Sequence, residues 1–114
     1  MNENLRIAVV GATGVVGREV LSALFDREVE AEQLTLLASE RSSGEALDYG
    51  EETLEVEVAS AETLQGHALV LLATPPEVSR TLAPQALAAG AWVVDVSAAL
   101  RSDGGVPLVL PGLN

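Results

Sequence analysis

Residues 9–21 read VVGATGVVGREVL, with glycines at positions 11, 14 and 17 between an apolar run and an amphipathic run. We expect a buried strand that ends at Gly11 and a helix that begins near Val15. A strand, a glycine-rich turn and a helix in this order present backbone N–H groups and the positive end of a helix dipole to an anion. The stretch therefore predicts a turn that binds phosphate.

The glycine spacing is G-x-x-G-x-x-G, whereas the common dinucleotide fingerprint is G-x-G-x-x-G. The context of the motif is nevertheless complete, because a strand pattern precedes it, a helix pattern follows it, and Thr13 places a hydroxyl in the turn. A glycine-rich turn without any ligand is the alternative interpretation. We favour nucleotide binding.

Hydrophobic periodicity predicts alternating strands and helices along the rest of the chain. The expected strands are residues 5–10, 34–38, 54–58, 68–73, 92–96 and a short one at 106–110. The expected helices are residues 15–25 and 77–89, and residues 44–50 are expected to be irregular. In the second helix we expect Val78, Leu82, Ala86 and Ala89 to share the core face, and Pro84 to kink or break the helix.

This order of elements predicts an α/β fold of the Rossmann type, a doubly wound, mostly parallel sheet in a three-layer αβα arrangement. We expect residues 1–114 to form one dinucleotide-binding domain. Ligands of such sheets bind at the carboxyl ends of the strands. The candidate site segments are therefore Gly11–Val16, Ser39–Ser43, Ala73–Pro76 and Asp95–Arg101.

The composition narrows the classes of partner. Seventeen acidic residues face six basic ones, all arginine, for a net charge of −11. Such a surface repels nucleic acid and anionic lipid. The chain has no apolar run of membrane-spanning length and no signal peptide at its start, so we expect no membrane partner and a cytoplasmic location. It has no cysteine, hence no thiolate metal site, and we expect no metal. The single histidine, His67, is expected in a surface loop.

The sequence Ala38–Gly44, ASERSSG, follows the second expected strand. An acidic residue at this strand end favours NAD, because it accepts hydrogen bonds from the ribose hydroxyls, and an arginine favours the 2′-phosphate of NADP. Arg41 lies among three serines that also donate to phosphate. Glu40 supports NAD, and a solvated turn without ligand is the alternative interpretation. We favour NADP.

Four blocks in order, GATGVVGREVL, LLASERSSG, VVDVSAALR and VPLVLPGLN, resemble the N-terminal cofactor domain of the aspartate-semialdehyde dehydrogenase family. The resemblance covers essentially the whole chain. It implies an NADP-dependent oxidoreductase of amino-acid biosynthesis that interconverts an aldehyde and an acyl phosphate. The residues that it assigns to the pyrophosphate are Gly11, Thr13, Gly14, Val15 and Val16. It assigns Ser39, Arg41 and Ser42 to the 2′-phosphate, Thr74 to the strand end that the cofactor passes, and Arg101 to the substrate phosphate.

Three blocks depart from that family. The family's D-N-S-S-A-F-R block reads DVSAALR here, at Asp95–Arg101. Its A-x-G-G is replaced by TPP at Thr74–Pro76, and its P-E-V-N reads PGLN at residues 111–114. These departures resemble the N-acetyl-gamma-glutamyl-phosphate reductase branch, or a non-catalytic paralogue. A separate nucleotide-binding module is a further alternative. A short-chain reductase type is close to excluded, because Tyr49 has no lysine partner.

Both enzyme branches use a cysteine nucleophile and a histidine that lie beyond the block ending at Asn114. This chain has no cysteine, and His67 precedes the phosphate block. We therefore expect the cofactor domain alone, without its catalytic and dimerisation domain, and no activity from the isolated chain. The resemblance implies a homodimer or tetramer for the parent enzyme, with a small-molecule cofactor and substrate as its partners.

Overall fold

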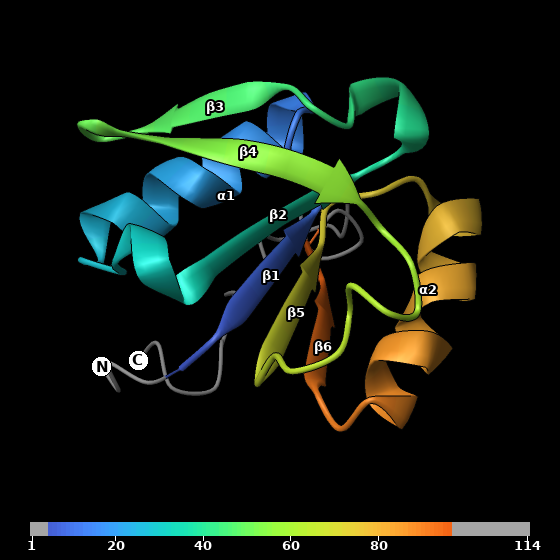
Figure 1. The fold of residues 1–114 in the computed structure, drawn as a ribbon. Coiled ribbons are helices and arrows are strands. Elements are labelled where there is room, and N and C mark those ends of the chain that lie inside the picture. The colour runs from blue at the N-terminus through green and yellow to red at the C-terminus, as the bar shows by residue number, and fades with distance from the viewer. Residues whose placement is uncertain (1–4, 97–114) are drawn as a thin grey trace, which may run out of the picture.

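A six-stranded sheet forms the centre of the computed structural model, which describes residues 5–96 (Figure 1). Its strands lie in the order β3-β4-β2-β1-β5-β6. The bounds are β1 (Ile7–Val10), β2 (Leu34–Ala38), β3 (Ala46–Tyr49), β4 (Glu52–Val58), β5 (Leu69–Leu72) and β6 (Trp92–Asp95). Every neighbouring pair is parallel except β3 and β4, which are antiparallel.

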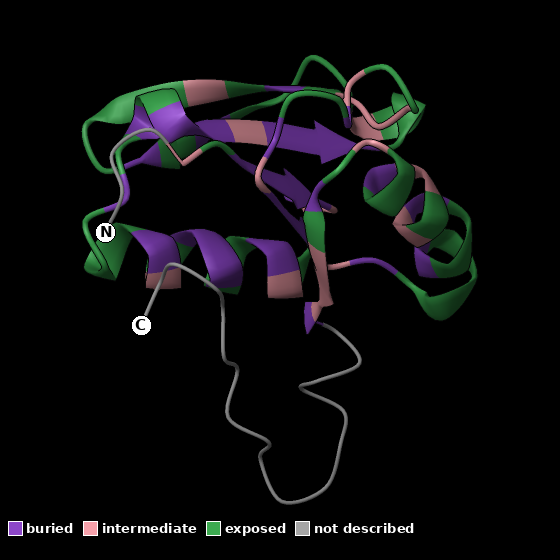
Figure 2. Cartoon of the chain, turned by 90° about the horizontal axis from the view of Figure 1, so that it is seen from below, coloured by how far each residue is buried: buried purple, intermediate pink, exposed green. Residues whose placement is uncertain are grey.

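Two helices cover the sheet, α1 (Val15–Asp26) and α2 (Pro76–Ala88), and two short 3-10 helices, η1 (Ala31–Gln33) and η2 (Glu40–Ser42), flank β2. Alternate residues of β1 divide between two apolar clusters. Ile7 and Val9 pack with the buried face of α1, whereas Ala8 and Val10 pack with α2. The helices therefore lie on opposite faces, with the buried side of α1 turned to the sheet in Figure 2. The predicted three-layer αβα fold is confirmed.

Strand β1 lies inside the sheet, and each of its residues is at most 1% exposed. It pairs with β2 on one side and β5 on the other. A strand with neighbours on both sides and helices on both faces has no solvated face, which is why its sequence is an unbroken apolar run. The chain order reverses across this strand, so the crevice at the carboxyl ends of β1 and β5 is the switch point of the sheet.

Both helices end in the same backbone motif. In α2 the N–H of Gly90 donates to Leu87 and the N–H of Ala91 to Ala86, with Gly90 at φ +89°. This is the Schellman arrangement, in which glycine supplies the left-handed residue. The predicted stop at Gly90 is thereby explained. In α1 the left-handed residue is Glu28, at φ +62°.

The irregular segment expected at residues 44–50 is wrong, because the chain forms β3 there and returns antiparallel as β4. Leu47 and Tyr49 are buried while Ala46 and Asp48 are exposed. That alternation is the period of a half-buried strand. Tyr49 donates a hydrogen bond to the Val29 carbonyl and its ring meets Phe25 edge-on at a centroid distance of 5.3 Å, which fixes the β3–β4 hairpin to the end of α1.

Two expectations for the second helix are corrected. The predicted break at Pro84 is wrong, because α2 runs from Pro76 to Ala88 as one helix, and the predicted kink stays a prediction. Val78 is 38% exposed, and the buried positions are Ser79, Leu82 and Ala86. The core face is therefore set by positions three and four residues apart that start at Ser79, a small residue that sequence hydrophobicity does not reveal.

His67 is buried rather than exposed in a surface loop. The residue is 8% exposed, and its Nδ1 lies 3.2 Å from the Leu64 carbonyl oxygen. His67 lies two residues before β5, and the next residue, Ala68, donates its N–H to the carbonyl of Arg6, just before β1. A histidine beside a buried strand can be covered by the preceding turn, which a local sequence pattern does not encode.

The expected strand at residues 106–110 lies outside the described residues. Within residues 5–96, neither helix is long and apolar enough to cross a membrane.

Candidate cofactor site

The glycine turn connects β1 to α1 and packs against the residues that follow β5. Gly11 has φ +83°, a conformation that side chains other than glycine rarely adopt. A Cβ at this position would lie 2.3 Å from the Ala73 carbonyl oxygen. The first glycine of the motif is therefore required by the fold at the switch point, where Ala73 follows β5 directly.

The third glycine is required for a different reason. Gly17 is buried in α1, and a Cβ there would lie 2.1 Å from the Gly11 carbonyl oxygen and 2.8 Å from the Ala12 Cα. Only a residue without a side chain lets the first turn of α1 approach the end of β1 this closely. This is the packing role that the last glycine has in dinucleotide-binding turns.

Gly14 differs from both neighbours in the motif. Its φ is −78°, and a Cβ there would meet nothing closer than the Gly11 carbonyl oxygen at 3.6 Å. The folded chain therefore has room for a side chain at this position. A glycine that neither φ nor packing requires leaves the backbone open to a group from outside.

Gly14 is also the N-cap of α1. Within the described part of the chain, no side chain caps it, and the first turn of α1 carries no acidic residue. The first N–H groups of a helix have no partner inside the helix. The N–H groups of Val15 and Val16 therefore have no partner within the helix and lie at the positive end of its dipole. Val15 is 77% exposed, so this helix end is open to solvent. This arrangement suits an anion.

The turn after β2 lies against the glycine turn. The backbone N–H groups of Gly11 and Ala12 both donate to the Leu37 carbonyl, at 2.8 and 3.3 Å. The Thr13 hydroxyl donates to the Ser42 hydroxyl at 3.2 Å, across 29 positions of sequence. Two candidate segments that the sequence predicted separately are therefore joined in the structure.

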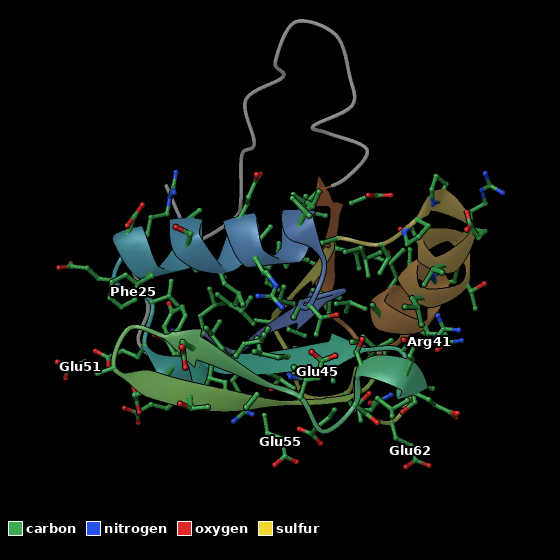
Figure 3. All side chains as sticks on the ribbon, turned by 90° about the horizontal axis from the view of Figure 1, so that it is seen from above. Phe25, Arg41, Glu45, Glu51, Glu55 and Glu62 are labelled. Atoms are coloured by element: carbon green, nitrogen blue, oxygen red, sulfur yellow. The ribbon has the colours of Figure 1, made fainter. Side chains whose placement is uncertain are left out.

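Arg41 and Ser39 are exposed on this turn. Ser39 is the N-cap of η2 and Arg41 lies within it. Figure 3 shows Arg41 on η2, at the end of the sheet where α2 also lies. The turn is held internally, since Ser42 donates its N–H to the Ser39 carbonyl and the Ser43 hydroxyl donates to the Glu40 carbonyl at 2.9 Å. Arg41 is thus a cation on a braced turn beside the glycine motif.

The hydroxyl of Thr74 points into the fold. It is buried and lies 2.7 Å from the Ser79 hydroxyl, which also donates to the Thr74 carbonyl. Pro75 is the N-cap of α2 and Pro76 its first residue, a position that proline suits because its missing N–H has no helical partner. Thr74 is placed beside Gly11 through its methyl group, not through a free hydroxyl.

Of the four segments expected to meet at this edge, the first three do so, at Gly11–Val16, Ser39–Ser43 and Ala73–Pro76. Arg101 lies outside the described residues. Sequence reasoning missed Ser79, the buried partner of Thr74, and the part that the Ala73 carbonyl plays in requiring Gly11. The spacing of Thr74 and Ser79 across a proline-started helix was the signal available for the first.

Comparison with known proteins identifies the family. A family model described as "Semialdehyde dehydrogenase, NAD binding domain" matches residues 6–114. The aspartate-semialdehyde dehydrogenases of Bacillus subtilis and of Synechocystis are 43% and 39% identical over 114 residues. Each match covers the whole chain and 33% or 34% of the relative, so the chain spans about a third of the length of these relatives.

Solved structures agree. The aspartate-semialdehyde dehydrogenase II of Vibrio cholerae, in a structure described as complexed with ASA, superposes with a TM-score of 0.77 at 35% identity, over 95% of this chain and 36% of that one. A minor L-lactate dehydrogenase of Enterococcus mundtii reaches 0.51 at 22% identity, a likeness of fold alone. The chain belongs to the NAD-binding domain family of the semialdehyde dehydrogenases.

Proposed function

We propose that this chain binds NADP across the carboxyl ends of β2, β1 and β5, as the cofactor domain of an aspartate-semialdehyde dehydrogenase. The observation that carries the proposal is the hydrogen bond from Thr13 to Ser42. It holds the glycine turn, which suits a pyrophosphate, beside the turn that bears Arg41, which suits a 2′-phosphate. A nucleotide with phosphate groups at two separate places matches this pair of turns.

The residues present fit a pyrophosphate at the glycine turn. Gly14 leaves space that no packing contact uses, and the N-terminus of α1 faces it without a capping side chain among residues 5–96. We assign Gly11, Thr13, Gly14, Val15 and Val16 to this part of the cofactor. Their contribution is backbone N–H donors and a helix dipole, which bind anions without any basic side chain.

We assign Ser39, Arg41 and Ser42 to the 2′-phosphate. A guanidinium with adjacent hydroxyls binds a phosphate monoester well, because every phosphate oxygen is an acceptor. The arginine supports NADP over NAD, although Glu40 in the same turn is the residue that NAD would use. Thr74 borders the cofactor path, with its hydroxyl committed to Ser79.

The activity of the whole enzyme is a wider proposal. When bound, the nicotinamide exchanges a hydride with the substrate during phosphate-dependent interconversion of an aldehyde and an acyl phosphate. We assign the substrate phosphate to Arg101, and the names of the matched relatives support aspartate rather than acetylglutamate as the parent substrate. We take residues 1–114 as one cofactor domain of a cytoplasmic homodimer or tetramer. Without a cysteine nucleophile the chain itself should be inactive.

Titration of the chain with NADPH and NADH tests the assignment. Fluorescence of the reduced nicotinamide or calorimetry gives both dissociation constants. We expect weak binding, with NADPH the tighter ligand. Equal affinities would overturn the choice of NADP, and measurable turnover with an acyl phosphate or a semialdehyde would contradict an inactive chain.

A further inference from the structure

Thr13 is held on two sides by different parts of the molecule. Its carbonyl oxygen accepts a hydrogen bond of 3.0 Å from the Arg18 guanidinium Nε, on the first turns of α1. Its hydroxyl donates to the Ser42 hydroxyl at 3.2 Å, on η2. One residue of the glycine turn therefore connects α1 with the turn that follows β2.

The direction of the second bond matters for an anion. Thr13 is the donor and Ser42 the acceptor in this geometry. A hydroxyl has one proton and two lone pairs, so Ser42 keeps its own proton after it has accepted from Thr13. That proton is free to be donated to a third group. A phosphate oxygen, which only accepts, is the complementary partner.

We propose that Thr13 is a positioning residue for recognition of the 2′-phosphate: Arg18 fixes it, and it orients the Ser42 hydroxyl beside Arg41. The inference rests on the proposed binding of NADP at this site. It adds that Thr13, although it belongs to the pyrophosphate turn, sets the preference between NADPH and NADH. Arg18 acts through Thr13 and contributes to the same preference.

The two roles of Thr13 make different predictions. If Thr13 serves only the pyrophosphate, its loss weakens NADPH and NADH by the same factor, because both carry that group. If it orients Ser42, its loss weakens NADPH selectively. The preference ratio, the dissociation constant for NADH divided by that for NADPH, separates the two.

The experiment uses the 114-residue chain and its variants Thr13→Val, Thr13→Ser, Ser42→Ala and the double variant Thr13→Val/Ser42→Ala. Titrations with NADPH and NADH are paired with titrations of adenosine 2′,5′-bisphosphate and 5′-AMP, which differ only in the 2′-phosphate. Valine keeps the shape of threonine without the hydroxyl, and serine restores the hydroxyl. Thermal melts check that each variant is folded.

We expect Thr13→Val to lower the preference ratio about three- to tenfold, the size of one oriented hydrogen bond. Thr13→Ser should retain the ratio. The double variant should be no worse than Ser42→Ala, because Thr13 acts only through the Ser42 hydroxyl, which Ser42→Ala already removes. Arg18→Ala should lower the ratio in the same direction. Arg27→Ala is its matched control, since among residues 5–96 the Arg27 side chain bonds only a carbonyl of its own helix, that of Ala23.

The outcomes separate this inference from the proposed function. If wild type binds NADPH and the bisphosphate, but Thr13→Val weakens all ligands equally, the positioning role is wrong and NADP binding stands. Additive losses in the double variant would also overturn it. If wild type binds neither NADPH nor the bisphosphate, the proposed function itself fails.

Discussion

The first and third glycines of the motif are in contact: a Cβ on Gly17 would lie 2.1 Å from the carbonyl oxygen of Gly11. Gly17→Ala should therefore destabilise the fold by about 1–3 kcal/mol, the usual cost of overpacking. Helix propensity alone would favour alanine here by about 1 kcal/mol, so the sign of the change is diagnostic. Urea unfolding of both proteins measures it. A stabilised variant would mean that α1 and β1 separate easily.

Gly14→Ala is the counterpart, since the fold leaves space for its methyl group. We expect the free energy of unfolding to change by no more than about 1 kcal/mol, the scale of an N-cap replacement. Cofactor affinity should fall about tenfold, or ~1.4 kcal/mol, because the methyl group would stand where the pyrophosphate approaches. The two measurements are unfolding and NADPH titration. An unchanged affinity for NADPH would show that the pyrophosphate does not bind at this turn.

Arg41→Ala should weaken NADPH by about 1–3 kcal/mol and leave NADH nearly unchanged, because a charge-assisted bond to the 2′-phosphate is lost. Arg80→Ala is a suitable control: Arg80 is also an exposed arginine, but it lies on α2 rather than η2. Calorimetric titration of both variants with both cofactors gives the comparison. A similar loss of NADPH affinity in the two variants would show that Arg41 acts through the overall charge of the protein and not through a contact with the 2′-phosphate.

The core of the fold could be predicted from local sequence patterns. The apolar runs that became β1 and β2 are buried on both faces, so hydrophobicity alone marks them, and β2 has the predicted bounds Leu34–Ala38. Gly90 ends α2 because glycine readily adopts the positive φ, here +89°, that this helix end requires. β3 was missed because it has four residues and only two of them are buried. Its stability depends on pairing with β4 and on contact with α1, which local patterns do not contain.

The sequence was enough to predict which segments form the site, but not which side chains in them contact one another. Parallel strands bring their carboxyl ends to one edge, so the first three segments were expected to meet there. The bond between Thr13 and Ser42 spans 29 positions and depends on the bend of η2. The buried pair of Thr74 and Ser79 likewise depends on how α2 begins. Hydroxyl partners of this kind follow from tertiary geometry, because serine and threonine have no fixed periodicity.

Glu28 occupies a position that glycine normally fills at the end of a helix. It has φ +62°, Val29 donates its N–H to Leu24, and Glu28 donates its own to Phe25. A left-handed side-chain residue costs roughly 1–2 kcal/mol, and glycine loses part of that advantage in the unfolded chain. Glu28→Gly should thus stabilise the fold by about 0.5–1 kcal/mol. Removing an acidic group near the negative end of α1 acts in the same direction.

The equivalent residue of α2 supplies the control for this change. Gly90, at φ +89°, ends α2 by the same two hydrogen bonds. Gly90→Ala should destabilise by about 1 kcal/mol, opposite in sign to Glu28→Gly. Urea midpoints of the two variants against wild type decide the matter. If Glu28→Gly lowers stability, the carboxylate makes a contribution larger than the backbone cost.

Tyr49 should make the fold sensitive to alkali. Burial, and secondly the nearby Glu30 carboxylate, raise the pKa of Tyr49 to about 12, from an ordinary value of 10.0. The protonated phenol is the form that donates to the Val29 carbonyl. Because the folded pKa lies above the unfolded one, this stabilisation is complete below about pH 10 and is lost as the pH rises toward 12.

The composition leaves few side chains that titrate in this pH range. The chain has one tyrosine, no lysine and no cysteine, so Tyr49 is the side chain that titrates between pH 10 and 12. We expect the free energy of unfolding to decline across this range in wild type and to stay nearly level in Tyr49→Phe. At neutral pH the variant should be about 1 kcal/mol less stable, because the Val29 carbonyl loses its donor. Absorbance of the phenolate in the folded protein gives the pKa directly. A midpoint near 10, or an equal alkaline decline in the variant, would show that the phenol is not protected by the β3–β4 hairpin and α1.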